Sequence, residues 1–104
     1  MEKKDPRMKQ SEYINSIETE PKPLAGSSLE LQALWWVRKG DWGKAHDLAQ
    51  DAGSPLGDWI HAHLHRMEGD LGNAAYWYSR AGKAVRQGDL AKEWEDLVGQ
   101  VIKE

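Results

Sequence analysis

Three closely spaced histidines offer the most chemistry of any side chains in this sequence. His61, His63 and His65 alternate along the segment HAHLHRME, and Glu68 follows three residues after the last of them. Successive residues of a helix are rotated by about 100°, so His61, His65 and Glu68 share one flank, whereas His63 lies on another side. Imidazole binds metal ions and titrates near neutral pH. The chemistry to weigh is therefore metal binding, proton transfer or ligand recognition.

Two of these chemistries lack the residues that would complete them. His61 and His65, with Glu68 as a third ligand, have a spacing that permits a metal site, but the sequence has no Cys and no HExxH motif. Acid–base catalysis by His65 and Glu68 would lack a nucleophile and a phosphate-binding loop. We therefore expect no catalytic residue, no metal and no cofactor. Metal binding or acid–base chemistry at His61, His65 and Glu68 remains the alternative.

Composition restricts the class of protein further. The chain has 104 residues, which suits one small domain, and six Trp and three Tyr supply its aromatic bulk because Phe is absent. The absence of Cys fits the reducing cytoplasm, where we expect the protein to be located. A net charge of −3 with both signs interspersed argues against nucleic-acid binding. No apolar run approaches the roughly 18 residues of a membrane span, so we expect no membrane insertion.

The elements that must position the histidines repeat along the chain. Residues 31–53 align with residues 60–82 at a spacing of 29 residues, and the identical positions are Ala33/Ala62, Gly40/Gly69, Asp41/Asp70, Gly43/Gly72, Ala45/Ala74, Ala52/Ala81 and Gly53/Gly82. A period of this length predicts a helix–turn–helix pair stacked on a copy of itself. In this register His65 takes the place of Trp36 and His61 that of Gln32. The copies thus differ on the flank that carries the histidines.

Helix signals predict an all-α domain over residues 27–104. We expect helices over residues 28–39, 42–51, 55–68, 71–81 and 90–103. Ser27 and Glu30 are expected to form a capping box at the first helix, and Gly-Asp pairs to end one helix and cap the next. The last helix should cap the open apolar end of the second pair and turn its Lys- and Glu-rich face to solvent.

Residues 1–26 differ in composition from the rest of the chain. They are rich in Lys, Glu, Ser and Pro, and the prolines at 6, 21 and 23 prevent a long helix. We expect a polar, mostly disordered arm. A short helix near residues 10–18 would let Tyr13, Ile14 and Ile17 dock on the core.

The second copy carries a recognisable pattern of small and aromatic residues, namely Gly69, Asp70, Leu71, Ala74, Trp77/Tyr78 and Ala81. This pattern resembles the second half of a tetratricopeptide repeat, although the period is 29 residues rather than about 34. The resemblance implies stacked helix pairs. The stretch AHLHRMEGDLGNAAYWYSRAGK also resembles a family of small uncharacterised bacterial proteins.

These observations favour a small non-enzymatic interaction module. Stacked helix pairs collect first-helix residues on a concave binding side, and arginine with aromatic residues is typical of binding hot spots. The expected ligand is a peptide, a protein segment or an anionic group. The expected binding residues are His61, His65, Arg66, Glu68, Tyr76, Trp77 and Arg80. Alternatives are a homodimer through an exposed Trp and a purely structural, hydrogen-bonded polar seam.

Overall fold

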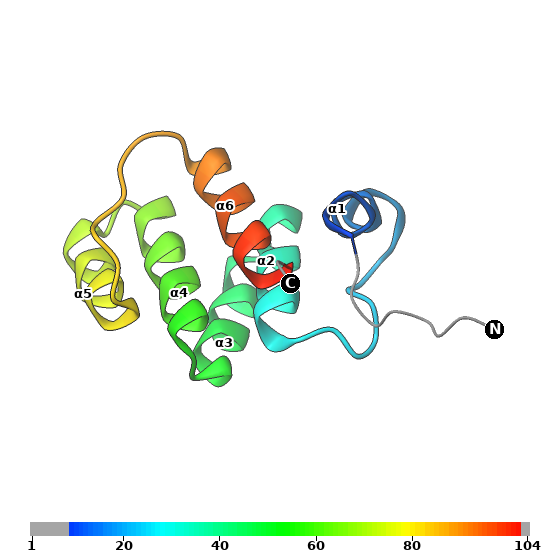
Figure 1. The fold of residues 1–104 in the computed structure, drawn as a ribbon, viewed down its shortest axis with the longest axis horizontal. Helices are drawn as coiled ribbons and strands as arrows, with labels where there is room; N and C mark the ends of the chain where they lie inside the picture. The colour runs from blue at the N-terminus through cyan, green and yellow to red at the C-terminus, as the bar shows by residue number, and fades with distance from the viewer. Residues whose placement is uncertain (1–8, 103–104) are drawn as a thin grey trace.

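The computed structural model describes residues 9–102, which form six α-helices and no strand within that range (Figure 1). The helices are α1 (Gln10–Thr19), α2 (Leu29–Lys39), α3 (Trp42–Ala52), α4 (Pro55–Met67), α5 (Leu71–Ala81) and α6 (Leu90–Ile102). The all-α fold class is confirmed. None of the helices in residues 9–102 combines the length and apolar character that crossing a bilayer requires.

Glycine–aspartate pairs end one helix and start the next, as the sequence predicts. Gly40 and Gly69 have φ angles of 90° and 84°, in the left-handed region that glycine adopts at low cost. Asp41 and Asp70 follow them, and each side chain accepts a hydrogen bond from the backbone N–H three residues on. Both turns therefore satisfy a free N–H of the following helix.

The predicted capping box at Ser27 is wrong. The cap of α2 is Ser28, whose hydroxyl accepts a hydrogen bond from the backbone N–H of Leu31. Glu30 does not reach back to the cap; its carboxylate accepts a hydrogen bond from the hydroxyl of Ser54, the cap of α4. Glu30 thus links the starts of two helices instead of stabilising its own.

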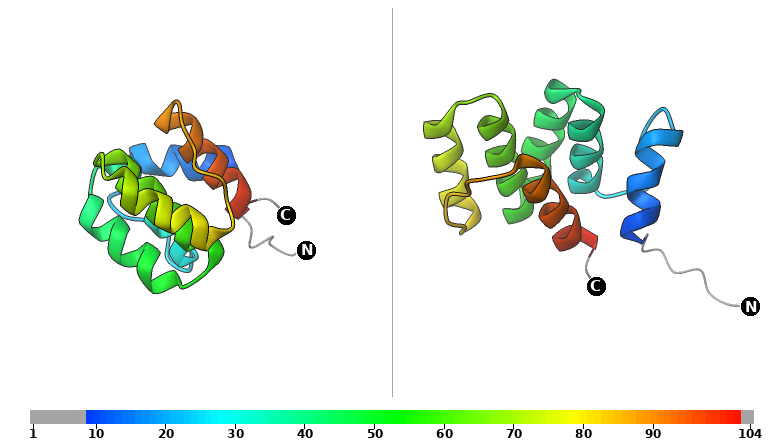
Figure 2. Two further views of the ribbon diagram at one scale, coloured as in Figure 1. Left: turned by 90° about the vertical axis from the view of Figure 1, so that its left-hand side faces the viewer. Right: turned by 90° about the horizontal axis from the view of Figure 1, so that it is seen from above.

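The helices α2, α3, α4 and α5 pack in sequence order, each against the next (Figures 1 and 2). We expected the last helix to cover the end of the body at α5, and this prediction is wrong. The last helix lies across α2 and α4, and α1 packs against α2 and α6. Within the described range, α4 is the one helix whose backbone comes close to that of α5. The outer side of α5 therefore has no helix against it.

The helix α1 docks on this body through buried side chains. Tyr13 and Ile17 lie in the core, and the Trp35 indole donates a hydrogen bond to the Ser16 hydroxyl over 3.0 Å. The Tyr13 hydroxyl donates to the carbonyl of Leu31. The short helix expected near residues 10–18 is thus one of the packed elements. Residues 1–8 of the predicted arm lie outside the described range.

Aromatic side chains from five helices dominate the core, in line with the composition. Trp35, Trp59 and Trp94 are buried, whereas Trp36 and Trp77 are only half-buried. The largest fully buried side chains are Trp35, Trp94, Tyr13, Tyr78, Leu34, Ile60, Leu64, Leu97, His63, Glu93 and Val98. A histidine and a glutamate in this set require internal polar partners.

Candidate functional site

The central helix α4 is buried nearly all round because it packs against α2, α3, α5 and α6. Every residue from Trp59 to His65 is buried, including His61, His63 and His65, which are 4%, 1% and 7% exposed. The flank of α4 that we expected to face a ligand is therefore covered by neighbouring helices. Its histidines divide between two polar clusters on different sides of the helix.

The first group, the three-histidine cluster, consists of His46 from α3 with His61 and His65 from α4. The ring centroids of His46 and His61 are 4.4 Å apart, and those of His61 and His65 are 5.0 Å apart. His46 and His65 complete the triangle at 5.7 Å. One ring nitrogen from each residue lies within 4.8 Å of the others. Residues from adjacent helices thus bring three imidazole nitrogens close together.

Two tryptophans enclose the three-histidine cluster. Trp77 of α5 lies flat against His61, with ring centroids 3.8 Å apart and planes 10° from parallel. Trp42 of α3 stacks on His46 at 4.9 Å and meets His65 edge-on at 5.7 Å. The Trp42 indole also donates a hydrogen bond to the carbonyl of Leu64 over 2.9 Å, which fixes its ring against α4. Aromatic rings therefore limit how far His61 and His65 can move.

The polar surroundings of His61 and His65 differ. His65 Nδ1 lies 2.8 Å from Glu68 Oε2, and because a carboxylate only accepts, Nδ1–H is the donor. In the neutral ring the lone pair of His65 is then on Nε2. Within residues 9–102, His61 Nδ1 is the one buried side-chain nitrogen or oxygen without a hydrogen-bond partner.

Burial is also the main influence on the pKa of His61. It lowers this pKa to about 4, and the nearby charges of His46, His65 and Arg80 lower it in the same direction. At neutral pH the His61 ring is therefore uncharged and has a lone pair on one nitrogen. Such a ring is in the form that binds metal ions.

The second group, the Glu93 cluster, surrounds one carboxylate of α6. The Glu93 side chain is fully buried and accepts hydrogen bonds from Trp59 and His63, over 2.9 and 2.8 Å. Arg66 Nη1 donates to it over 2.8 Å, and the Tyr78 hydroxyl donates as well. Burial by itself would raise the pKa of Glu93, but hydrogen bonds from His63, Tyr78 and Trp59 outweigh burial and lower the pKa to about 2. The cluster holds an ionised, fully paired carboxylate between α4, α5 and α6.

Most of the predicted site residues lie together. Tyr76 and Trp77 meet edge-on at 5.2 Å, and the Arg80 guanidinium lies 5.1 Å from the Trp77 ring centroid. Because Trp77 also stacks on His61, these α5 residues border the three-histidine cluster, and Glu68 reaches it through His65. We call Tyr76, Trp77 and Arg80 the α5 surface. Tyr76 is 54% exposed and Arg80 is also exposed.

Arg66 is the predicted site residue that the structure separates from the others. Its guanidinium pairs with Glu93 and donates to the carbonyl of Gly88, in the segment before α6. The arginine is therefore engaged inside the fold rather than available to a ligand. Its place in the Glu93 cluster could not be inferred from α4 alone.

Two residues of these clusters escaped the sequence analysis, and both carried a signal. Glu93 comes three residues after Leu90 and four before Leu97, so it lies on the apolar stripe of the last helix rather than on a solvated face. His46 comes four residues after Trp42 in the predicted second helix, a spacing at which side chains meet. Both signals are local, whereas the partners of Glu93 and His46 lie on another helix.

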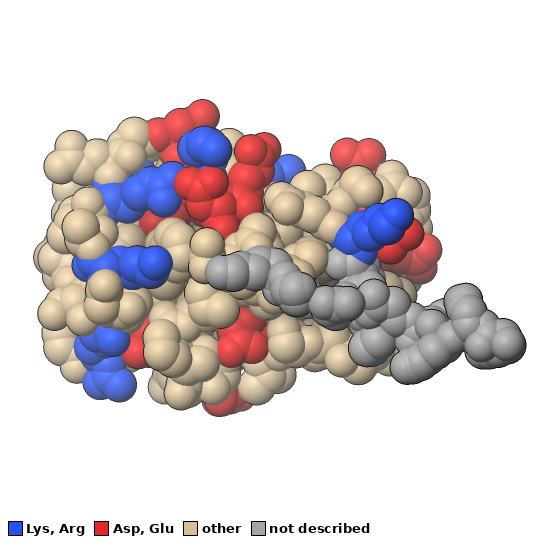
Figure 3. Space-filling view, in the orientation of Figure 1, with Lys and Arg blue, Asp and Glu red and all other residues tan. Residues whose placement is uncertain are grey.

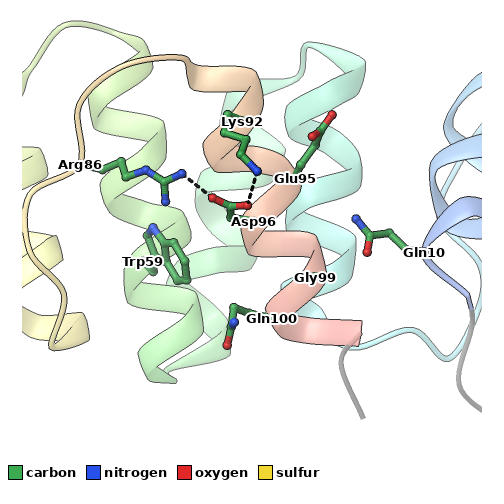
Figure 4. A pocket seen from close by; sticks show the side chains of 8 residues that line it. All are labelled: Gln10, Trp59, Arg86, Lys92, Glu95, Asp96, Gly99 and Gln100. Carbon is green, nitrogen blue, oxygen red and sulfur yellow. Dashed lines mark hydrogen bonds and ion pairs between the residues drawn. The ribbon is translucent and has the colours of Figure 1, made fainter.

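The molecule also has a surface hollow of about 540 Å³ beside α6 (Figure 4). Trp59 lines it, with polar residues from α1 and α6 around it. The Asp96 carboxylate in the hollow already pairs with Arg86 and, over 3.2 Å, with Lys92. The charges that converge there neutralise one another, so the hollow is a weaker candidate than the histidine cluster.

Comparison of the chain with protein-family models, curated proteins and solved structures finds no match. A function for the chain therefore has to be argued from the two clusters and the surfaces next to them.

Proposed function

We propose that the protein is a small non-enzymatic interaction module that binds an acidic peptide segment of a partner protein at the α5 surface. The proposed scaffold is tetratricopeptide-like and consists of two helix–turn–helix pairs, α2–α3 and α4–α5, related by the 29-residue period. Matching glycine–aspartate turns inside the pairs and the packing of α3 on α4 support this scaffold. Repeat proteins of this kind bind partners on surfaces formed by their stacked pairs.

The position of α6 determines which surface remains for a partner. This helix lies across α2 and α4, the first helices of the two proposed pairs, and so occupies the side where such scaffolds collect ligands. The open outer side of α5, which has no helix against it, is the observation that carries the proposal. An end without a neighbouring pair leaves side chains of α5 free for a partner.

The charge near α5 favours an acidic partner. Residues 71–88 contain no acidic residue, in a chain whose net charge is −3. Of their three cations, Arg80 and Lys83 are exposed, whereas Arg86 pairs with Asp96. Figure 3 shows lysine and arginine groups on the side of the molecule formed by α5 and the segment after it. Arg80 lies beside the rings of Tyr76 and Trp77, and arginine with aromatic rings is a common hot-spot composition.

Selection from a displayed library of random peptides tests this proposal. We expect the retained peptides to be enriched in Asp and Glu. Synthetic copies should bind the double variant Tyr76→Ala/Arg80→Ala at least about 10-fold more weakly than the wild type, in fluorescence polarisation, because two hot-spot contacts are lost. Lys22→Ala is the matched control, since it removes an exposed positive charge just after α1, the helix at the other end of the molecule from α5. Retained peptides without acidic residues, or equal binding by the double variant, would contradict the proposal.

The same surface would serve in a homodimer, which is the second candidate. Tyr76 and the half-buried Trp77 are the side chains that would meet across such an interface. Light scattering coupled to size-exclusion chromatography separates the two cases. If the wild type is a dimer and Tyr76→Ala is a monomer, the α5 surface is a homodimer interface. If the wild type is a monomer even at high concentration, the acidic peptide remains the proposed occupant of this surface. We also infer a cytoplasmic location from the absence of Cys.

A further inference from the structure

The three-histidine cluster joins α3 to α4 through nitrogen donors alone. Imidazole nitrogen is a preferred ligand of Zn²⁺, Cu²⁺ and Ni²⁺. In a tetrahedral zinc site, ligand nitrogens about 2.0–2.1 Å from the ion are roughly 3.4 Å from one another. The corresponding nitrogens of His46, His61 and His65 already lie within 4.8 Å of each other, so small rotations of the rings would bring them to that spacing.

His61 supplies a second, independent observation. Its side chain is buried and stacked on Trp77, yet Nδ1 has no hydrogen-bond partner. A buried polar atom without a partner is costly, and native structures seldom leave one without a reason. An ion coordinated by Nδ1 would give this atom the partner that it lacks.

Glu68 holds His65 in the orientation that metal binding requires. Its carboxylate accepts a hydrogen bond from Nδ1–H over 2.8 Å, which leaves the Nε2 lone pair for the ion. A carboxylate behind a ligating histidine is the usual outer-shell arrangement in metalloproteins, because it fixes the ring and makes the ligand more basic. Glu68 is thus a positioning residue and not the third ligand that the sequence suggested.

Two tryptophans cover the three-histidine cluster, and His46 connects it to solvent. Trp77 covers His61, and Trp42 lies against His46 and His65, so aromatic rings keep water from much of the centre. The His46 side chain is 23% exposed and provides the route by which an ion would enter. Its Nδ1 lies 3.7 Å from Oδ1 of Asp47, which is too far for a hydrogen bond.

From this geometry we propose that His46, His61 and His65 bind one divalent transition-metal ion of the zinc class between α3 and α4. Three protein ligands leave a fourth position for water or for a donor atom of a partner. The ion would fasten the first proposed helix pair to the second. This inference is independent of peptide binding at the α5 surface, and either could fail without the other.

Another group of possible ligands overlaps this one and must be distinguished from it. His65, Glu68 and Asp70 also place donor atoms within 4.8 Å of one another, but both carboxylates are exposed. Asp70 already caps α5, and Glu68 already accepts a hydrogen bond from His65. The experiment therefore includes a variant of Asp70.

The test uses full-length protein without a histidine tag, stripped of metal with a chelator. Co²⁺ is titrated in while the visible d–d absorption is followed, and Zn²⁺ affinity is measured by competition with a chromophoric chelator. We expect one ion per chain, with the absorption of tetrahedral Co²⁺. His46→Ala should weaken binding by at least about 10-fold, since even loss of an outer-shell partner has that effect. His46→Gln provides a second variant of similar size, and circular dichroism checks the folding of each protein.

The controls are matched to the alternatives. His63→Asn removes a histidine outside the cluster and keeps a donor for Glu93, so it should bind metal as the wild type does. Asp70→Asn keeps the helix cap and should also bind as the wild type does. Absence of binding by the wild type, undiminished binding by both His46 variants, or loss of binding in Asp70→Asn would overturn the proposal.

Discussion

Oε1 of Glu93 lies 2.8 Å from Nδ1 of His63, although 30 residues separate the two in the sequence. This contact is one of four hydrogen bonds that a single carboxylate of α6 accepts from α4 and α5. All four donors lose their acceptor if the Glu93 side chain is removed, and a neutral carboxyl group would accept from them less well. The interior of the fold is therefore organised around one buried negative charge.

Glu93→Gln should lower the free energy of unfolding by about 3–5 kcal/mol, the usual cost of breaking a buried ion pair. The amide cannot replace the charge opposite Arg66, and its own N–H groups would face donors. Urea unfolding followed by tryptophan fluorescence measures the change. Glu95→Gln on the exposed side of the same helix is the control and should change stability by no more than about 0.5 kcal/mol. Similar values for the two variants would contradict a central role for the Glu93 cluster.

The Glu93 cluster also predicts how stability depends on pH. Folding lowers the pKa of Glu93 from 4.5 to about 2, so the native state favours the ionised carboxylate. The resulting stabilisation is complete above about pH 4.5 and is lost as the pH falls through about 2. We expect the difference in unfolding free energy between wild type and Glu93→Gln to shrink over this interval. A difference that stays constant from pH 5 to pH 2 would show that the carboxylate does not titrate with a lowered pKa.

Much of the helical framework could be predicted from the sequence because its signals are local. The five main helices begin and end within one residue of the expected positions, since glycine, aspartate, serine and proline mark their ends. The capping box at Ser27 failed because two adjacent serines compete for one role. Glu30, three residues later, was occupied by a partner from another helix.

The clusters were harder to predict because they depend on how the helices pack. Periodicity correctly put His61 and His65 on one flank of α4 and His63 on another. It could not show that α3 would bring His46 to the first flank or that α6 would bring Glu93 to the second. The position of α6 across α2 and α4 is decided by the side chains of three helices together, so no single segment contains that information.

The close approach of α3 and α4 rests on a glycine. A Cβ atom at Gly57 would lie 2.9 Å from the Ala49 carbonyl oxygen and 3.0 Å from the Ala52 Cβ atom. Gly57→Ala should therefore lower the unfolding free energy by about 1–3 kcal/mol, as overpacking does. Gly72→Ala is the matched control: it lies in a helix with nothing within 4 Å of its Cβ position, so it should be about 0.4–1 kcal/mol more stable than the wild type. Thermal and urea unfolding should show a loss of stability in Gly57→Ala and a gain in Gly72→Ala. Unchanged stability in Gly57→Ala would mean that α3 and α4 lie further apart.

Glu68→Gln tests whether the negative charge of Glu68, beyond the hydrogen bond that orients His65, strengthens the proposed metal site. The amide oxygen can still accept a hydrogen bond from His65, but it lacks the charge that makes His65 a more basic ligand. We therefore expect Zn²⁺ affinity to fall by about 10- to 100-fold while one ion still binds per chain. Asp51→Asn, which removes an exposed negative charge of α3, should leave the affinity close to that of the wild type. An equal loss in both variants would attribute the effect to net charge alone, and an unchanged affinity in Glu68→Gln would show that the charge of Glu68 adds nothing to the hydrogen bond that orients His65.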